Sequence, residues 1–352
     1  MNKDKKKQIQ LRKSVAPFAK TKTKKSIFQL INSIVPFIML WFFAYKSLSV
    51  SFWLSLVCSI IAAGFVVRIF IIFHDCAHMS FFKSGKANRI VGTLTGIITH
   101  FPFEKWKRSH ALHHATSGNL DKRGDGDIWV MTIEEYREAG FWLRLGYRLY
   151  RNPFVLFGLG PLFLLFGSNR FNRKGAPKRE RYNTYLINIS IVAIYALFIW
   201  GIGWQTFLAV QFPIMYLAAA VGIWLFYIQH TFEDSYFENE DEWDYVKAAV
   251  EGSSYYKLPK VLEWITGNIG YHHVHHLAPK IPNYYLEEAH ESTPPLQKAT
   301  TITIPESFKS IRFRLYDPDN KKFVSFKEFK SMERERQEKT QMARVQVSLP
   351  KK

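Results

Sequence analysis

Nine of the twelve histidines in this chain lie in three short clusters. In chain order the clusters read His74-Asp-Cys-Ala-His78, His110-Ala-Leu-His113-His114 and His272-His-Val-His275-His276. Spacings of three and four residues place side chains on one face of a helix, and neutral imidazole is the commonest side-chain metal ligand in proteins. Three such faces brought together would supply more nitrogens than one ion needs. The clusters therefore predict a site with more than one metal ion, rather than scattered surface histidines or a pH sensor.

The remaining histidines fit the ligand pattern less well. His273 is out of phase within the third cluster, so we expect it behind the ligands or at the surface, and we assign no site role to His100 and His290. His230 ends a long apolar run and fits a structural histidine as well as a ligand, but its position near the clusters favours a ligand. The candidate metal ligands, and with them the candidate catalytic residues, are His74, His78, His110, His113, His114, His230, His272, His275 and His276.

The composition indicates a membrane protein. The chain has 352 residues, a formal net charge of +19 and 16% aromatic residues. A charge of this size would also fit a nucleic-acid-binding protein. Here, however, the basic stretches alternate with long apolar runs, which is how Lys and Arg gather on the cytoplasmic side of membrane spans. We therefore expect a polytopic membrane protein and no nucleic-acid partner. The two cysteines form no CxxC pair, which excludes a thiolate zinc site or a dithiol redox site.

Four apolar runs are long enough to cross a bilayer, which takes about 20 helical residues. They cover residues 28–45, 52–73, 185–201 and 204–228, and the short gaps within each pair predict two antiparallel hairpins. Basic residues precede the first run and fill the segment 169–181, so we expect both termini in the cytoplasm. The same topology brings every histidine cluster to the cytoplasmic face of the plasma membrane. Arg68 lies inside the second run, and we expect its guanidinium to reach the membrane interface.

Two shorter apolar runs, 90–103 and 153–167, do not fit simple spans. We expect re-entrant or interfacial helices there; as true crossings they would raise the number of spans from four to six. The expected fold is an all-α integral membrane protein in which two transmembrane hairpins support a cytoplasmic helical cap. Its expected parts are a basic cytoplasmic tail (1–27), a membrane domain with the catalytic cap (28–303) and a charged cytoplasmic C-terminal segment (304–352).

Two features of the C-terminal segment are also predicted. Alternation and a turn signal in residues 313–326 indicate a β-hairpin. The charged stretch 332–352 is expected to fray.

The pattern of residues narrows the choice of metal. Imidazole suits iron, copper, zinc and nickel. A hydrolytic zinc helix would carry HExxH, which this sequence lacks. A haem held by two histidines would bury its ligands in the middle of a span, whereas these histidines lie at the ends of the predicted spans. A pair of irons with positions open to oxygen fits best.

Taken together, HxxxH, HxxHH and HxxHH beside two membrane hairpins resemble the membrane fatty acid desaturase and hydroxylase superfamily, over roughly residues 52–279. Further stretches resemble the acyl-lipid desaturases of Gram-positive bacteria; they are 73–78, 113–124, 229–234 and 267–276. The resemblance implies that the nine histidines bind two iron ions. It also implies that O2 is used to introduce a cis double bond, at the delta-5 position, into saturated acyl chains of membrane lipids.

The resemblance also suggests further site residues. An Asn-held water completes the site in some relatives, and Asn268 is a candidate by residue type. Asp127 and Trp129 follow the second cluster and could line the substrate entrance; packing and a helix cap are the alternative roles.

Two electrons per turnover must come from outside, because the sequence shows no GxGxxG motif after a strand and no fused cytochrome domain. A ferredoxin or flavodoxin could be steered by the basic face, or that charge could serve topology alone. Two other functions stay open, a hydroxylase of the same superfamily and a histidine-rich metal transporter. Against the transporter, Arg68 is the one formal charge in the four long runs.

Overall fold

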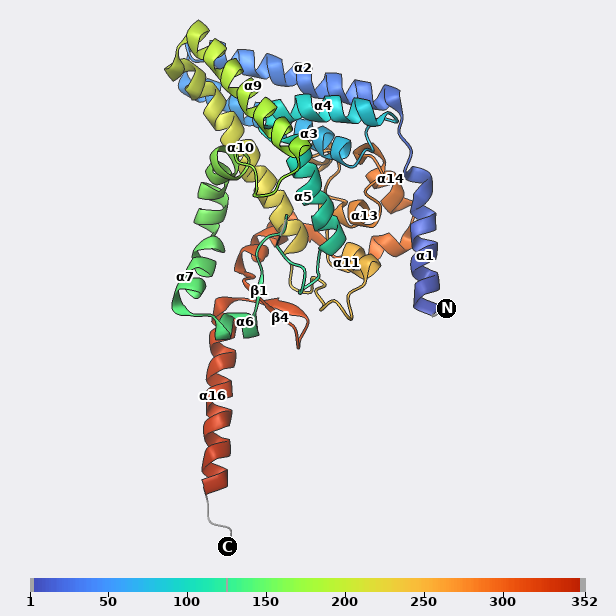
Figure 1. The fold of residues 1–352 in the computed structure, drawn as a ribbon, viewed down its shortest axis with the longest axis vertical. Coiled ribbons are helices and arrows are strands. Elements are labelled where there is room, and N and C mark those ends of the chain that lie inside the picture. The colour runs from blue at the N-terminus through green and yellow to red at the C-terminus, as the bar shows by residue number, and fades with distance from the viewer. Residues whose placement is uncertain (1–2, 125, 349–352) are drawn as a thin grey trace.

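The computed structural model describes residues 3–124 and 126–348 and is helical over most of its length (Figure 1). Four helices are long and apolar enough to cross a membrane. They are α2 (Thr23–Ser47), α3 (Phe52–Ala77), α9 (Lys178–Ile202) and α10 (Trp204–His230). The predicted fold class is therefore confirmed, and each of the four apolar runs lies in a helix that could span a membrane. Both α2 and α9 begin several residues before the apolar runs, because their basic first turns continue the helix.

The helix α3 is the central one of the four. In the apolar 18-residue stretch of α3, 56% of the residues are buried inside the protein, whereas in the corresponding stretch of α9 only 6% are. The helix α9 would therefore expose most of its surface to lipid. The helices α2, α4 (Gly85–Thr99) and α10 pack directly on α3. Gly203 separates α9 from α10 with a φ of +80°, a left-handed backbone conformation that glycine adopts without strain.

The two shorter apolar runs form broken or short helices. The helix α4 has 15 residues and a length of about 22 Å, less than the roughly 30 Å of a bilayer core. The second run forms a π-helical segment that a short α-helix interrupts, and it is bent by 62° from the preceding helix α7 (Phe141–Tyr150). Its parts are η2 (Phe154–Leu159), α8 (Gly160–Leu162) and η3 (Phe163–Ser168). Within the described residues there are four candidate spans, or five if this bent pair forms one. A re-entrant or interfacial placement stays a prediction.

Shorter elements gather at the ends of the long helices opposite the hairpin turns (Figure 1). The helices and helical turns not yet given are α1 (Lys3–Val15), η1 (Ala16–Phe18), α5 (Phe103–Thr116), α6 (Ile133–Glu138), α11 (Tyr245–Glu251), α12 (Lys260–Ile265), α13 (His272–Leu277), η4 (Asn283–Tyr285), α14 (Leu286–Glu291), η5 (Pro294–Lys298), α15 (Ile304–Ser307), η6 (Phe308–Arg312) and α16 (Phe326–Ser348). The last turn of α3 and the end of α10 reach this group of elements, where α5 and α13 also lie.

Short strands connect the C-terminal segment to the rest of the protein. They are β1 (Met131–Thr132), β2 (Tyr255–Lys257), β3 (Thr301–Thr303), β4 (Leu315–Asp317) and β5 (Lys322–Val324). The antiparallel β4–β5 pair, with Leu315 opposite Val324, confirms the predicted hairpin. The strand β1 pairs in parallel with β4, and β2 pairs in parallel with β3.

Two expectations from the sequence are wrong. The stretch expected to fray is helical as far as Ser348, because Glu, Lys, Arg, Gln and Met are good helix formers; its last residues, 349–352, lie outside the described range. Arg68 does not reach the interface: it is 5% exposed. Its guanidinium donates to the carbonyl oxygen of Trp264 and lies 3.9 Å from the centre of that indole. Cation–π contact with α12 thus replaces hydration.

Candidate metal centre

The nine candidate ligands come from four helices that meet at one place. The last turn of α3 carries the first cluster, α5 carries the second and α13 carries the third, while His230 is the last residue of α10. The short helix α13 is held close to β2, since Tyr256 donates its N–H to the carbonyl oxygen of Gly270 over 2.8 Å. A Cβ atom at Gly270 would lie 2.4 Å from the carbonyl oxygen of Tyr256, so only glycine permits this approach.

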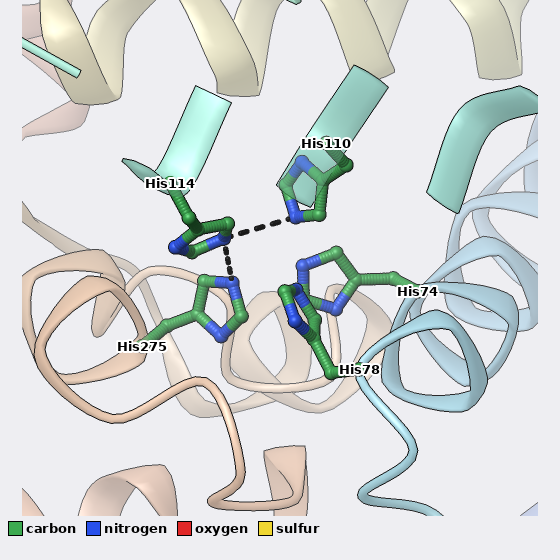
Figure 2. Close-up of side chains that lie close together, drawn as sticks. All are labelled: His74, His78, His110, His114 and His275. Carbon is green, nitrogen blue, oxygen red and sulfur yellow. Dashed lines mark hydrogen bonds between the residues drawn. The ribbon is translucent and has the colours of Figure 1, made fainter. Parts of the chain in front are cut away.

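The nine imidazoles separate into two groups, and each group has its nitrogens within 4.8 Å of one another. The first group contains His74, His78, His110, His114 and His275 (Figure 2), and the second contains His113, His230, His272 and His276. Each group is a set of ligand atoms that could hold a metal ion.

The helical repeat explains how the HxxHH clusters divide. Successive residues of a helix are about 100° apart around its axis, so the adjacent His113 and His114 cannot face the same point. His110 and His114, four residues apart, face the first group, and His113 faces the second. In α13 the assignment is reversed, since His272 and His276 face the second group and His275 the first. Each of these helices therefore contributes to both groups.

The distances between ring nitrogens fit ligands that share an ion. Nitrogens bound at about 2.1 Å lie about 3.0 Å apart in neighbouring octahedral positions and about 3.4 Å apart in tetrahedral ones. In the first group, His114 Nε2 is 3.1 Å from His110 Nε2 and 2.9 Å from His275 Nε2. In the second, the four Nε2···Nε2 distances lie between 2.9 and 3.3 Å. A neutral imidazole has one N–H, so hydrogen bonds alone would not satisfy so many converging nitrogens.

Burial prepares the rings to act as ligands. Burial first, and the neighbouring imidazoles or cations second, hold the pKa values of six rings well below their usual range. These rings are those of His78, His110, His114, His272, His275 and His276. They are neutral at physiological pH and keep a lone pair for a metal. Among the described residues, the buried Nε2 atoms of His74 and His78 have no hydrogen-bond partner, which a bound ion would supply.

Oxygen acceptors behind three of the rings select the nitrogen that faces inward. His74 Nδ1 lies 3.2 Å from Asp75 Oδ1, His113 Nδ1 contacts Asp127 Oδ1, and His230 Nδ1 lies 3.1 Å from the carbonyl oxygen of Gly252. A proton on Nδ1 that is donated to oxygen leaves the Nε2 lone pair free. Gly126, with a φ of +91°, lets the chain turn closely past Ser109 to deliver Asp127.

Asp75 is itself held by a buried amide network that the sequence did not reveal. Its Oδ2 accepts the backbone N–H of Asn283 at 2.7 Å and the side-chain amide of Asn283 at 2.8 Å. Gln29 of α2 completes the network, donating to Asn283 Oδ1 at 2.9 Å and accepting from Asn283 Nδ2 at 3.2 Å. All three side chains are buried. The network fixes the last turn of α3 to α2 and η4, although Asp75 and Asn283 are 208 residues apart.

The other candidates lie elsewhere. His273 is fully buried, not at the surface, and pairs with His290 over 3.0 Å; burial lowers its pKa to about 3. Asn268 occupies a left-handed turn with a φ of +57°, and its amide reaches the carbonyl oxygen of Asn283 at 3.5 Å. Trp129 packs on Tyr147 with ring centres 5.0 Å apart and on Tyr150, and it does not line the cavity described next.

An apolar cavity of about 450 Å³ leads to the histidines. Its walls come mainly from α3 and α10, and its lining includes Val66, Val67, Phe70, Met215, Ala218 and Ala219. One end of the cavity reaches His74, His110 and His272. Trp106 lines the same end and stacks on His110 with ring centres 4.1 Å apart. A small-molecule site typically has a volume of about 300–1,000 Å³.

Comparisons with known proteins agree on one family. The family model described as fatty acid desaturase matches residues 51–304. A fatty acid desaturase of Bacillus subtilis (strain 168) is 59% identical over 324 residues, which is 92% of each chain. An sn-1 oleoyl-lipid 12-desaturase of Synechocystis sp. is 27% identical over 240 residues, 63% of each chain. An sn-1 acyl-lipid omega-3 desaturase (ferredoxin) of the same organism is 28% identical over 236 residues, 65% of this chain and 64% of that one.

Replacing the carboxylate behind His74 tests whether the first group holds a metal. In Asp75→Asn, the new amide can donate to His74 Nδ1 and so favour the tautomer whose Nε2 carries the proton. Changing the hydrogen-bond partner of a metal-bound histidine costs about 10–100-fold in metal affinity. We expect the purified variant to lose the metal of the first group during dialysis against a chelator, measured by elemental analysis. The exposed Asp319→Asn is the matched control and should retain metal as the wild type does. Equal retention in both variants would contradict this role of Asp75.

Proposed function

The chain belongs to the fatty acid desaturase family, and we propose that it is an acyl-lipid desaturase whose nine converging histidines, His230 among them, hold two iron ions. As a family member it is an oxidoreductase of lipid metabolism, and its helices are those of a membrane protein. The proposed reaction uses O2, two electrons from an outside donor and two protons to remove two hydrogens from a saturated acyl chain of a membrane lipid, and it leaves a cis double bond and two molecules of water. The irons, when bound, would supply the oxidising power that no side chain has.

The chain's own residues would supply ligands, orientation and a dry site. The two groups offer five and four nitrogens, an all-imidazole set that suits iron. Asp75, Asp127 and the carbonyl oxygen of Gly252 would fix the ring orientations. The apolar walls of α3 and α10 would keep water away from the acyl chain and hold it against His74, His110 and His272. No charged group is needed to bind a hydrocarbon, and the apolar lining fits such a substrate.

The cavity is deep enough for the part of the acyl chain that lies beyond a double bond close to the carboxyl end. On α10 the lining runs from Gln229 to Met215, which corresponds to about 21 Å of helix. An extended hydrocarbon chain advances about 1.25 Å per carbon, given C–C bonds of about 1.5 Å at tetrahedral angles. Desaturation at carbon 5 of a sixteen-carbon chain leaves about eleven carbons, or about 14 Å, beyond the reacting bond. The cavity can accommodate that length and a bend. Its depth is thus compatible with the delta-5 position, which we propose from the resemblance to acyl-lipid desaturases of Gram-positive bacteria.

The distribution of charge supports a cytoplasmic site in the plasma membrane. Lysines are frequent before α2, and α9 begins with Lys178, Arg179 and Arg181, at the ends where the histidines lie. Cytoplasmic flanks of spans are enriched in Lys and Arg. Both termini would then lie in the cytoplasm. A soluble donor of the ferredoxin or flavodoxin type could reach the site there, and one relative carries ferredoxin in its name.

Expression in a bacterial host that lacks unsaturated fatty acids of this kind tests the proposed reaction. We expect new cis-monounsaturated chains in the membrane lipids, with the double bond at carbon 5, identified by gas chromatography and mass spectrometry. His113→Ala removes a ligand of the second group outside the apolar parts of the spans. This variant should insert into the membrane equally well and yield no unsaturated product. Hydroxylated chains would instead favour a hydroxylase of the same family, and unchanged lipids from inserted, iron-loaded protein would refute both activities.

Filling the cavity tests its role as the acyl-chain site. Gly222 lies on α10 about 10 Å along the helix axis from Gln229, and a Cβ atom there would meet open space. A phenyl ring at this position would leave room for about eight carbons beyond the reacting bond, whereas desaturation at carbon 5 needs about eleven there for a sixteen-carbon chain and about seven for a twelve-carbon chain. We expect Gly222→Phe to lower the yield of sixteen-carbon products at least tenfold, while chains of twelve carbons are still desaturated. The matched control Gly201→Phe places the same ring at an exposed glycine of α9 and should keep the wild-type profile. An unchanged chain-length profile in Gly222→Phe would show that the acyl chain lies elsewhere.

A further inference from the structure

We propose that a collar of basic side chains beside His78 is the docking surface for an acidic one-electron carrier protein. The inference rests on the proposed function, since that reaction requires electrons from outside. The basic collar consists of Arg89, Lys107, Arg179 and Lys280. It is drawn from α4, α5, α9 and the loop that follows α13.

His78 marks the place where the protein layer over the first group is thinnest. Of the nine candidate ligands, His78 is the one that is only partly buried, whereas the other eight are at most 8% exposed. The cavity reaches His74, His110 and His272, whereas His78 does not line it. An acyl chain and an electron donor would therefore approach the centre from different sides, and neither would block the other.

The collar lies beside this partly buried ligand. Lys107 precedes His110 by three residues and His114 by seven, so it shares their face of α5 one turn nearer the start of the helix. Lys280 is exposed and follows His276 by four residues. Burial and, in decreasing order, His74, Lys280, His113 and Lys107 lower the pKa of His78, so both lysines lie close enough to act on this ring.

The surface around these lysines is continuous and strongly positive. The start of α5 is attached to α9, because the backbone N–H of Glu104 donates to Asn183 Oδ1 at 3.1 Å. Glu104 accepts Arg179 at 2.8 Å and lies 4.0 Å from Arg89, so it brings both arginines to the same surface. The basic collar thus contains four cationic side chains, and the carboxylate of Glu104 lies among them. Burial lowers the pKa of Lys107, Glu104 raises it, and Arg89, Arg179 and Lys280 lower it further.

The positive surface extends beyond the collar toward the start of α2. Lys25 Nζ lies 4.4 Å from the ring centre of Tyr285, and Lys22 lies over the same ring at 5.8 Å. Tyr284, next in the chain, packs in one apolar cluster with Trp106 and Phe82, beside the histidines. The carboxylate of Glu288 also acts on Lys22, so the charge of this extension is partly offset. A protein with an acidic face would meet complementary charge mainly at the collar, which raises association rates at low salt far above those of neutral surfaces.

Charge reversal at the two lysines nearest the histidines tests the docking surface. The probe is a reduced plant-type [2Fe–2S] ferredoxin, mixed by stopped flow with the iron-loaded, full-length protein in phosphatidylcholine nanodiscs, and its oxidation is followed by absorbance. In the wild type we expect the second-order rate to fall between about 0.05 and 0.5 M salt, as the screening length shrinks from about 14 to 4 Å. The double variant Lys107→Glu/Lys280→Glu should be at least tenfold slower at low salt, with a rate that changes little with salt.

The matched control reverses two exposed lysines in the C-terminal segment. Lys309→Glu/Lys330→Glu changes the net charge by the same amount and should keep the wild-type rate and salt dependence. Equal rates for wild type and the collar variant, or equal slowing in the control, would overturn the proposal. A defect that appears only in discs containing phosphatidylglycerol would assign the collar to anionic lipid and would overturn it too. Iron content and the fatty acids made by the expressing host test the proposed function separately, so an active enzyme with an unaffected variant contradicts the collar alone.

Discussion

The geometry of the α-helix is the constraint on which the rest of this structure depends. Neighbouring residues point about 100° apart, so two histidines that are adjacent in the sequence of a helix cannot bind the same ion. In α5 and α13 the outer histidines of HxxHH face one group, and the histidine three residues into the motif faces the other. Two helices bearing this motif therefore define two centres side by side, and α3 and α10 must end beside them to complete the two sets. The transmembrane hairpins can be understood as the scaffold that brings those two ends together.

Gathering nine imidazoles in a buried site is costly unless each ring is oriented and its nitrogens are satisfied. The protein meets part of this demand with oxygen acceptors: Asp75 behind His74, Asp127 behind His113 and the Gly252 carbonyl behind His230. Burial keeps the rings that lie outside the spans neutral, so their lone pairs are available at physiological pH. What these contacts leave unsatisfied is a set of converging nitrogens, the demand that bound metal ions would meet. Substrate and electrons would then reach the centre by separate routes, through the apolar cavity and across the basic collar.

Short-range sequence patterns predicted much of the fold and of the candidate metal centre. Spacing identified eight of the nine histidines that meet, and position at the end of an apolar run identified the ninth, His230. Apolar length identified the four candidate spans, and alternation identified the β4–β5 hairpin. Contacts between distant segments were beyond such patterns. Nothing local links Asp75 to Asn283 and Gln29, or Arg68 to Trp264, because each contact exists only once the fold has formed. Asp127 illustrates the same point: its position after the second cluster suggested the substrate entrance, whereas its carboxylate contacts His113. His273 was out of phase with the ligands, as the spacing indicated, but its buried partner His290 could not be foreseen.

The central claim is that the two histidine groups hold two separate iron ions. Anomalous diffraction from crystals of the purified protein, recorded on both sides of the iron absorption edge, tests it most directly. The account predicts two iron peaks, one among His74, His78, His110, His114 and His275 and the other among His113, His230, His272 and His276. A single peak shared by both groups, or fully occupied peaks that show no iron edge, would contradict it.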